Sequence, residues 1–162
     1  MIQGFLNIEL LPWQQDVAMQ MLRGGEKLLT PPSGIGASGG RTYMGAVLAF
    51  LFVTKNLLLS GPDWQKVIVI NPNSQLRVYL NSFINDSPLK EIFIKHRNII
   101  YIRGFEDCKF ILFLDLIDSK EIMGFFGNLL FILDGNGRPY PTWAEEIISA
   151  SISSDNCYVY RT

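Results

Sequence analysis

The chain has 162 residues, of which 48% are hydrophobic and 12% aromatic, and its formal net charge at pH 7 is −1. This length suits one domain with a sizeable core, and the hydrophobic content excludes an intrinsically disordered chain. A charge so close to zero does not indicate a strongly basic nucleic-acid module, although a few loops could still contact DNA or RNA.

Cysteine and histidine give no sign of a metal site. Cys108 and Cys157 are far apart and have no partner at metal-ligand spacing, so we interpret them as small hydrophobic residues in a reducing compartment. The only histidine, His96, lies between Lys95 and Arg97 and is expected in a solvated loop.

The sequence does not favour membrane insertion or secretion. The N-terminus lacks a secretory signal, and the longest apolar run, residues 44–53, is too short to span a bilayer. We therefore expect a protein of the cytoplasm that has no membrane partner, and we interpret the apolar run as a buried helix.

In chain order, the pattern alternates between helix and strand, which predicts an α/β three-layer sandwich: a mostly parallel sheet with helices on both faces. The expected helices run from Pro12 to the glycine pair 24–25, from 42 to about 58, from an N-cap at Asn73 or Ser74 to about 84, through a short segment after Ser119, and onward from Pro141. The expected strands are 27–30, 66–70, 98–102, 109–114, 128–133 and 157–160.

A glycine-rich loop, 33–40, joins the first predicted strand to the long apolar helix. Glycines let backbone N–H groups turn toward phosphate oxygens, and the helix N-terminus faces the same anion. The usual motif is G-x-x-x-x-G-K-[ST], whereas here Arg41 replaces lysine and Ile35 replaces the first glycine. The nucleotide-binding candidates of this segment are Gly36, Ser38, Gly39, Gly40, Arg41 and Thr42. The alternative is a strand-to-helix turn without a ligand.

The apolar strand 129–133 ends in Asp134, which fits the carboxylate that organises magnesium in such sites. Thr42 would be the second metal ligand. In a catalytic version glutamate follows the aspartate and polarises water, but here Gly135 follows, and the nearest alternatives are Glu145 and Glu146. Read alone, residues 134–137 could also form a simple turn.

Two weaker signals complete the set. Gln14 or Gln15 could read an adenine edge, or could simply cap the first helix beside the anchor Trp13. The strand-turn-helix segment 67–76, with help from Arg77, could hold a nucleic-acid phosphate, or could be an ordinary connection.

The order of these four features resembles the first RecA-like P-loop domain of superfamily 2 helicases and of viral terminase large subunits. The resemblance covers nearly the whole chain and is slightly closer to the terminase. It is carried by segments 12–14, 39–46, 74–77 and 124–127, while 158–162 lies where a coupling motif would lie.

The resemblance implies ATP and magnesium as cofactors, with hydrolysis driving movement along double-stranded DNA. Other motor subunits or a second lobe would be partners, and a viral chain would act in the host cytoplasm or nucleus. The implied catalytic residues are Arg41, Asp134 and Glu145, and Gln14 or Gln15 would touch adenine. The end of the chain after one apparent strand favours a cut domain or a reduced version.

Two alternatives remain. Because Arg41 and Gly135 replace residues needed for phosphate binding and water activation, the chain could be a degenerate P-loop module that binds protein partners without hydrolysis. A small kinase-like P-loop enzyme ranks last, since we find neither an arginine-bearing lid nor an acidic substrate motif.

Overall fold

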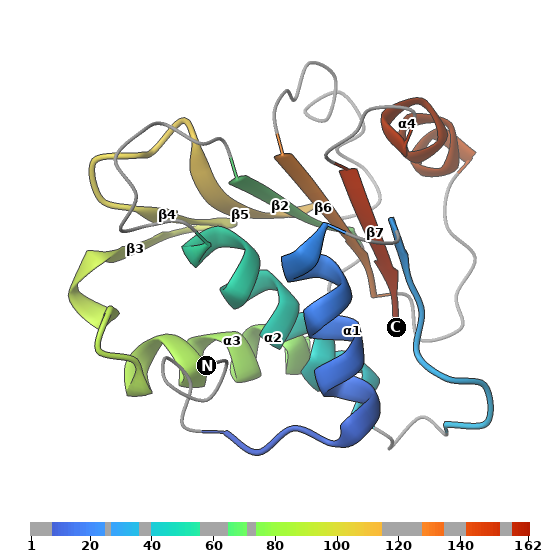
Figure 1. The fold of residues 1–162 in the computed structure, drawn as a ribbon. Coiled ribbons are helices and arrows are strands. Elements are labelled where there is room, and N and C mark those ends of the chain that lie inside the picture. The colour runs from blue at the N-terminus through green and yellow to red at the C-terminus, as the bar shows by residue number, and fades with distance from the viewer. Residues whose placement is uncertain are drawn as a thin grey trace.

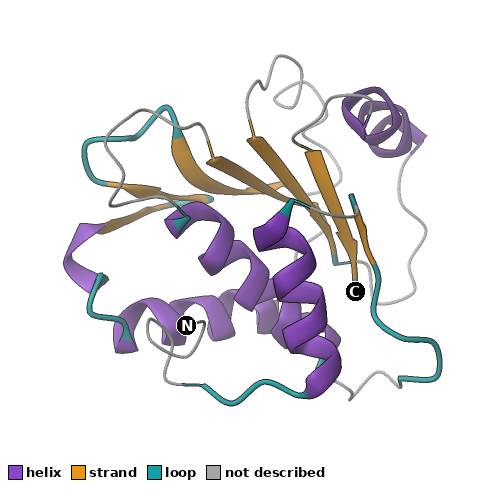
Figure 2. Cartoon of the chain, viewed as in Figure 1, coloured by secondary structure: helices purple, strands orange, loops and turns teal. Residues whose placement is uncertain are grey.

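A computed structural model describes residues 8–24, 27–35, 40–55, 65–70, 74–114, 128–134, 142–152 and 157–162 (Figure 1). The described chain forms three layers, with one sheet in the middle. Three helices cover one face of the sheet, namely α1 (Pro12–Arg23), α2 (Arg41–Thr54) and α3 (Ser74–Asp86), and α4 (Thr142–Ile152) lies on the other face (Figure 2). The prediction of a mostly parallel sheet with helices on both faces is therefore confirmed.

The sheet has seven strands in the order β1-β7-β6-β2-β5-β4-β3. Their bounds are Leu28–Leu29 (β1), Gln65–Ile70 (β2), Phe93–His96 (β3), Ile99–Ile102 (β4), Lys109–Leu114 (β5), Asn128–Leu133 (β6) and Cys157–Arg161 (β7). The first five strands in this order are parallel, and β4 and β3 continue the sheet as an antiparallel hairpin. Ile70 pairs with both Leu114 and Leu133, so the central strands end level with one another.

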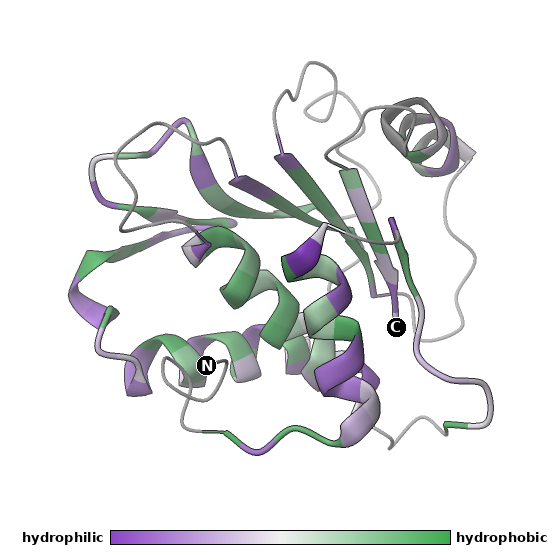
Figure 3. Cartoon of the chain, in the orientation of Figure 1, coloured by the Kyte–Doolittle hydropathy of each residue, from purple (hydrophilic) through white to green (hydrophobic). Residues whose placement is uncertain are grey.

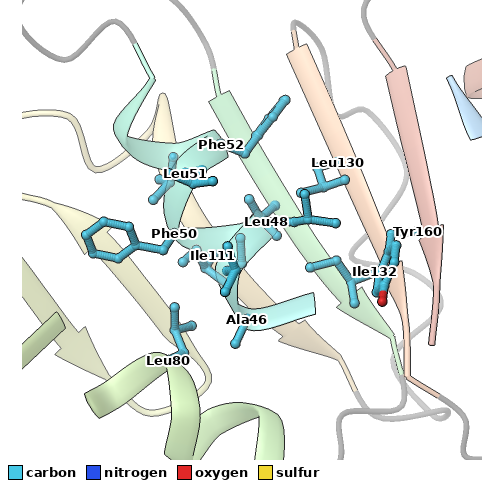
Figure 4. Packing of buried hydrophobic residues seen from close by; sticks show 14 of the residues in the cluster. Ala46, Leu48, Phe50, Leu51, Phe52, Leu80, Ile111, Leu130, Ile132 and Tyr160 are labelled. Carbon is cyan, nitrogen blue, oxygen red and sulfur yellow. The ribbon is translucent and has the colours of Figure 1, made fainter. Parts of the chain in front are cut away.

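Helix α2 is the centre of the larger core. Every residue from Met44 to Val53 is buried, because the sheet lies on one side of the helix and α1 and α3 lie on the others. Figure 3 shows the helix as apolar along its length, whereas α1 and α3 each keep a hydrophilic outer face. Leu48 belongs to the same cluster as Ile132 and Tyr160, whose side chains lie between α2 and the sheet (Figure 4).

A second core lies on the opposite face of the sheet. Residues from β2, β5, β6 and β7 alternate with those that face α2, and they pack with Ala144 and Ile148 of α4. Both faces of the central strands are therefore apolar, which explains the continuous hydrophobic runs of β5 and β6.

Most predicted elements are confirmed, with differences at their ends. Strands 109–114 and 128–133 have the predicted bounds, but strand 27–30 shortens to two residues. Helix α2 ends at Thr54 instead of near 58, because Lys55 leaves the helical conformation (φ −57°, ψ 133°). The short helix predicted after Ser119 lies outside the described residues.

The main correction concerns His96. We expected a solvated loop, whereas His96 is exposed at the end of β3, a strand that the sequence did not predict. Only Phe93 of this strand is buried, so its sequence carries little of the alternation that identifies a strand. Among the described helices, none combines the length and apolar content needed to cross a bilayer.

Candidate nucleotide site at the carboxyl edge of the sheet

The carboxyl ends of the parallel strands bring together residues that are far apart in the sequence. Asp134 directly follows β6, and Thr162 directly follows β7, the neighbouring strand. Helix α2 starts at the same edge. In open α/β sheets this edge is where ligands bind, because loops and helix N-termini converge there.

Asp134 is the centre of the site. Its side chain is 2% exposed, and its Oδ1 accepts hydrogen bonds from the hydroxyls of Thr162 (3.0 Å) and Thr42 (3.5 Å). The Asp134 backbone N–H donates to the Ile70 carbonyl at 3.2 Å, which fixes the strand end against β2. Two residues that the sequence proposed as metal ligands, 92 positions apart, therefore lie within reach of one ion.

The start of α2 provides backbone donors. Gly40 is the N-cap and has a left-handed conformation (φ +82°), which glycine adopts without steric cost. No side chain caps this helix end within the described part of the chain. The first N–H groups of a helix have no partner inside it, and in this position they face the strand edge at which an anion could bind.

Gln14 contacts Gly40, the last residue of the glycine-rich loop, directly. Its side chain is 3% exposed; Oε1 accepts from the Leu11 backbone N–H (2.9 Å), and Nε2 donates to the Gly40 carbonyl (3.4 Å). Gln14 therefore joins the start of α1 to the start of α2. Gln15 is exposed and donates to the Leu10 carbonyl at 2.9 Å, so the structure does not bring it to the same contact.

Arg41 is half-buried in the first turn of α2, and its carbonyl accepts a 2.8 Å hydrogen bond from the Tyr160 hydroxyl. Burial raises the pKa of Tyr160 far above its ordinary value; the Arg41 charge opposes this shift and the Asp134 charge adds to it. Tyr160 therefore stays a neutral donor that ties β7 to the start of α2.

Glu145, the candidate for water activation, lies in α4, on the face of the sheet opposite α2. It forms a two-pronged ion pair with Arg161, with distances of 2.9 and 3.0 Å between nitrogen and oxygen atoms. The hydrogen bond from Arg161 lowers the pKa of Glu145, which makes the carboxylate a weaker base. Side chains alternate along β7, so Arg161 faces away from the side on which Tyr160 meets α2. The structure does not bring Glu145 together with Thr42 and Asp134, and its catalytic role stays a prediction.

The donor set of the site fits magnesium. A buried carboxylate and a threonine hydroxyl offer hard oxygen ligands, and magnesium in nucleotide sites commonly takes its remaining ligands from phosphate and water. The described residues contain no group of three or more His, Cys, Asp or Glu that could hold a metal ion by themselves. The other predicted residues, Gly36, Ser38 and Gly39, lie outside the described residues, as does Gly135.

Sequence reasoning did not single out Tyr160 or Thr162. Both belong to the segment at which we expected a coupling motif, but the individual roles depend on the pairing of β7 with β6. A hydroxyl residue directly after a buried strand, at the edge where Asp134 ends β6, is the signal that could have identified Thr162.

Comparison with known proteins agrees with this fold class. No family model and no curated protein sequence matches the chain. Its three layers and mostly parallel sheet define an α/β domain of the RecA-like kind. The fold is similar to that of the large terminase of bacteriophage HK97, a crystal structure that is 18% identical in sequence with a TM-score of 0.64. The match covers 95% of this chain and 33% of the terminase, so the chain spans about a third of that protein. At this identity the likeness shows the fold alone.

Proposed function

We propose that the chain is the nucleotide-binding ATPase domain of a DNA-translocating motor of the terminase or superfamily 2 helicase kind. The observation that carries the proposal is the contact between Thr42 and Asp134 beneath the uncapped start of α2. A hydroxyl, a buried carboxylate and free backbone donors at one strand edge are what a magnesium–nucleotide complex requires. The terminase-like fold supports the same conclusion.

Each residue has a defined task in this proposal. Thr42 and Asp134 would hold magnesium, which when bound would neutralise charge on the phosphate oxygens. The first N–H groups of α2 and the Arg41 side chain would bind the phosphates, and Tyr160 would keep that helix end in place through the Arg41 carbonyl. Gln14, already bonded to Gly40, would stand next to the nucleotide. Thr162 would orient the Asp134 carboxylate.

Binding can be tested by calorimetric titration of the chain with ATP, with and without magnesium. We expect saturable binding that magnesium strengthens. Thr42→Ala should weaken magnesium-dependent binding by roughly tenfold, which corresponds to about 1.4 kcal/mol, and Thr42→Ser should restore it. Arg41→Ala should weaken binding further, since it removes the only candidate phosphate charge in the 33–42 loop.

Thr54→Ala is the matched control for Thr42→Ala. Thr54 lies in the last turn of the same helix, where its hydroxyl donates to the Phe50 carbonyl at 2.7 Å. This variant also removes one threonine hydroxyl from α2, but at the end distant from Asp134. Equal effects of the two alanine variants, or no binding by the unmodified chain, would contradict the proposal.

A second candidate function is nucleotide binding without hydrolysis, in a regulatory or structural module. The observation that favours it is the Glu145–Arg161 ion pair, because the carboxylate predicted to activate water is already paired with Arg161. Gly135 has no side chain that could activate water in its place. Phosphate release measured with DNA and with a second lobe or motor subunit decides between the two functions. Turnover under those conditions supports the motor, since a partner can supply an arginine finger. Tight binding without turnover supports the module.

A further inference from the structure

Four basic residues gather where the β3–β4 hairpin meets α3. Lys95, His96 and Arg97 are consecutive and exposed at the hairpin tip, and Arg77 of α3 reaches the same place. We call these four residues the hairpin cluster. Figure 1 shows the hairpin at the end of the sheet opposite β1. The sequence suggested that segment 67–76 could hold a nucleic-acid phosphate with help from Arg77, and the fold brings Lys95, His96 and Arg97 to Arg77.

The Arg77 side chain is held in position. Its guanidinium carbon lies 4.3 Å from the centre of the Phe113 ring, and Nη2 donates to the Arg97 carbonyl at 3.1 Å. Stacking on one face leaves the other N–H groups of the guanidinium fork for a planar or anionic partner. Within the described chain, no member of the hairpin cluster forms an ion pair; Lys95 donates only to the neutral amide of Asn85, at 3.5 Å.

The turn itself carries an unusual residue. Arg97 has a φ of +51°, and it is the only described non-glycine residue with a positive φ. Tight hairpin turns favour glycine in this conformation because it lacks a Cβ, and they tolerate asparagine and aspartate because their short polar side chains can hydrogen-bond locally. A long cation at such a position breaks the local rule, and residues that break local rules concentrate at functional sites.

The hairpin cluster lies at the same edge of the sheet as Asp134. The Phe113 backbone N–H donates to the Asn98 carbonyl at 2.8 Å, which places the hairpin tip beside the carboxyl end of β5. Strands β4 and β6 are separated by β5 and β2, so about 14 Å of sheet lies between the hairpin and the strand that ends in Asp134. A ligand long enough to bridge this distance could contact both regions.

We propose that the hairpin cluster binds the phosphate backbone of a nucleic-acid duplex. Lysine and arginine are the side chains that most often contact backbone phosphates, and such contacts do not depend on base sequence. The exposed large apolar side chains of the described chain are Leu11, Leu28 and Val78, none of them in the hairpin. Membrane-surface binding and single-strand binding both use exposed apolar or aromatic side chains. Because the described hairpin tip has no exposed large apolar side chain, a nucleic-acid duplex is the favoured partner. The choice of DNA rests on the proposed function.

The test is fluorescence anisotropy with a labelled DNA duplex of about 30 base pairs and mixed sequence, measured between 50 and 200 mM salt. We expect the unmodified chain to bind with the weak, salt-dependent affinity of non-specific contacts, with a Kd on the order of 10⁻⁶ to 10⁻⁴ M at physiological salt. The double variant Lys95→Ala/Arg97→Gly should raise Kd at least about tenfold and reduce the salt slope by about 2.

Two controls keep the result interpretable. Lys90→Ala/Arg103→Ala removes the same charge from the opposite end of the hairpin, where both residues are exposed, and should change Kd less than about twofold. Arg97→Gly alone should leave the thermal midpoint unchanged or raise it, since glycine suits the positive φ, while still weakening duplex binding. Weaker binding by this variant therefore cannot come from misfolding.

Three results would overturn the proposal: no duplex binding by the unmodified chain at 50 mM salt, equal losses in the hairpin and control variants, or binding to phosphatidylserine vesicles in place of the duplex. The ATP titration, repeated on the hairpin variant, separates this proposal from the proposed function. We expect unchanged ATP affinity there. Hairpin-dependent duplex binding without any ATP binding would reject the nucleotide site alone, and ATP binding without hairpin-dependent duplex binding would reject the hairpin alone.

Discussion

The two faces of the sheet differ sharply at its carboxyl edge, although consecutive residues at the end of β7 and directly after it contribute to both. On the α2 face, Tyr160 (0% exposed) bonds to the Arg41 carbonyl, and Thr162 bonds to the buried Asp134. On the α4 face, Arg161 and Glu145 pair with each other, with side chains 44% and 45% exposed. One face is a fixed polar network inside the fold, and the other is a solvent-exposed ion pair.

In the proposed function, this difference would separate nucleotide binding from turnover. Of the groups that would hold a magnesium–nucleotide complex, Asp134 is buried and Thr42 and Arg41 are half-buried, and hydrogen bonds connect all three to neighbouring elements. Polar networks with satisfied partners are rigid. The carboxylate that would have to activate water is exposed and engaged in an ion pair. In the proposed function, nucleotide binding and hydrolysis would therefore depend on different faces of the sheet, and we expect mutations to change them independently.

The largest effect is expected at Asp134. Asp134→Asn keeps the side-chain shape and the acceptor for Thr162 but removes the negative charge that would attract magnesium. We expect MgATP affinity in a calorimetric titration to fall roughly a hundredfold, about 2.8 kcal/mol. Glu145→Gln, on the other face, removes the same charge and should alter affinity by less than about twofold. Similar losses in both variants would remove the distinction between the faces.

A stability effect of intermediate size is expected at Gly40. Alanine there adopts a left-handed conformation that costs about 1–2 kcal/mol, and its Cβ would lie 2.8 Å from Gln14 Nε2. Gly34→Ala is the control, since Gly34 has a similar φ of +89°, but no atom of the described residues lies within 4 Å of the added carbon. In denaturant unfolding, Gly40→Ala should lose about 1 kcal/mol more than Gly34→Ala, because it also disrupts the Gln14 hydrogen bond. Equal losses would show that the contact between α1 and α2 contributes nothing.

The smallest effect concerns the Glu145–Arg161 pair. Arg161 lowers the pKa of Glu145 in the folded chain, so the pair stabilises the fold above the carboxyl's unfolded pKa and loses this contribution as pH falls through the folded value. Because both side chains are about half exposed, we expect about 0.2–1 kcal/mol at neutral pH. The difference in unfolding free energy between the unmodified chain and Glu145→Gln should shrink as pH falls toward about 3. A difference that does not change with pH would exclude the ion pair as its cause.

Much of the fold could be predicted because burial dominates its central elements. Strands β5 and β6 are apolar on both faces, so their bounds are readable as continuous hydrophobic runs. β3 could not be predicted, since its exposed Lys95 and His96 do not differ from loop residues in sequence. The hairpin forms because its partner β4 supplies the pairing.

The sequence predicted which residue types belong to the candidate site, but not which of these residues contact one another. Thr42 and Asp134 follow from local patterns, a helix start and a strand end. Their proximity, and the roles of Tyr160 and Thr162, require that β7 lie beside β6, which chain order does not determine. Gln14 illustrates the limit: its type suggested adenine binding, whereas its described partners are Leu11 and Gly40.

Hydrogen exchange with and without MgATP tests most directly whether the nucleotide binds on the α2 face. Backbone amides that bind phosphate or become covered exchange more slowly, and the effect can be assigned to peptides. We expect slower exchange at residues 40–43 and around Asp134, with no change in α4, residues 142–152. Protection confined to α4, or no protection at the start of α2 under saturating MgATP, would contradict it.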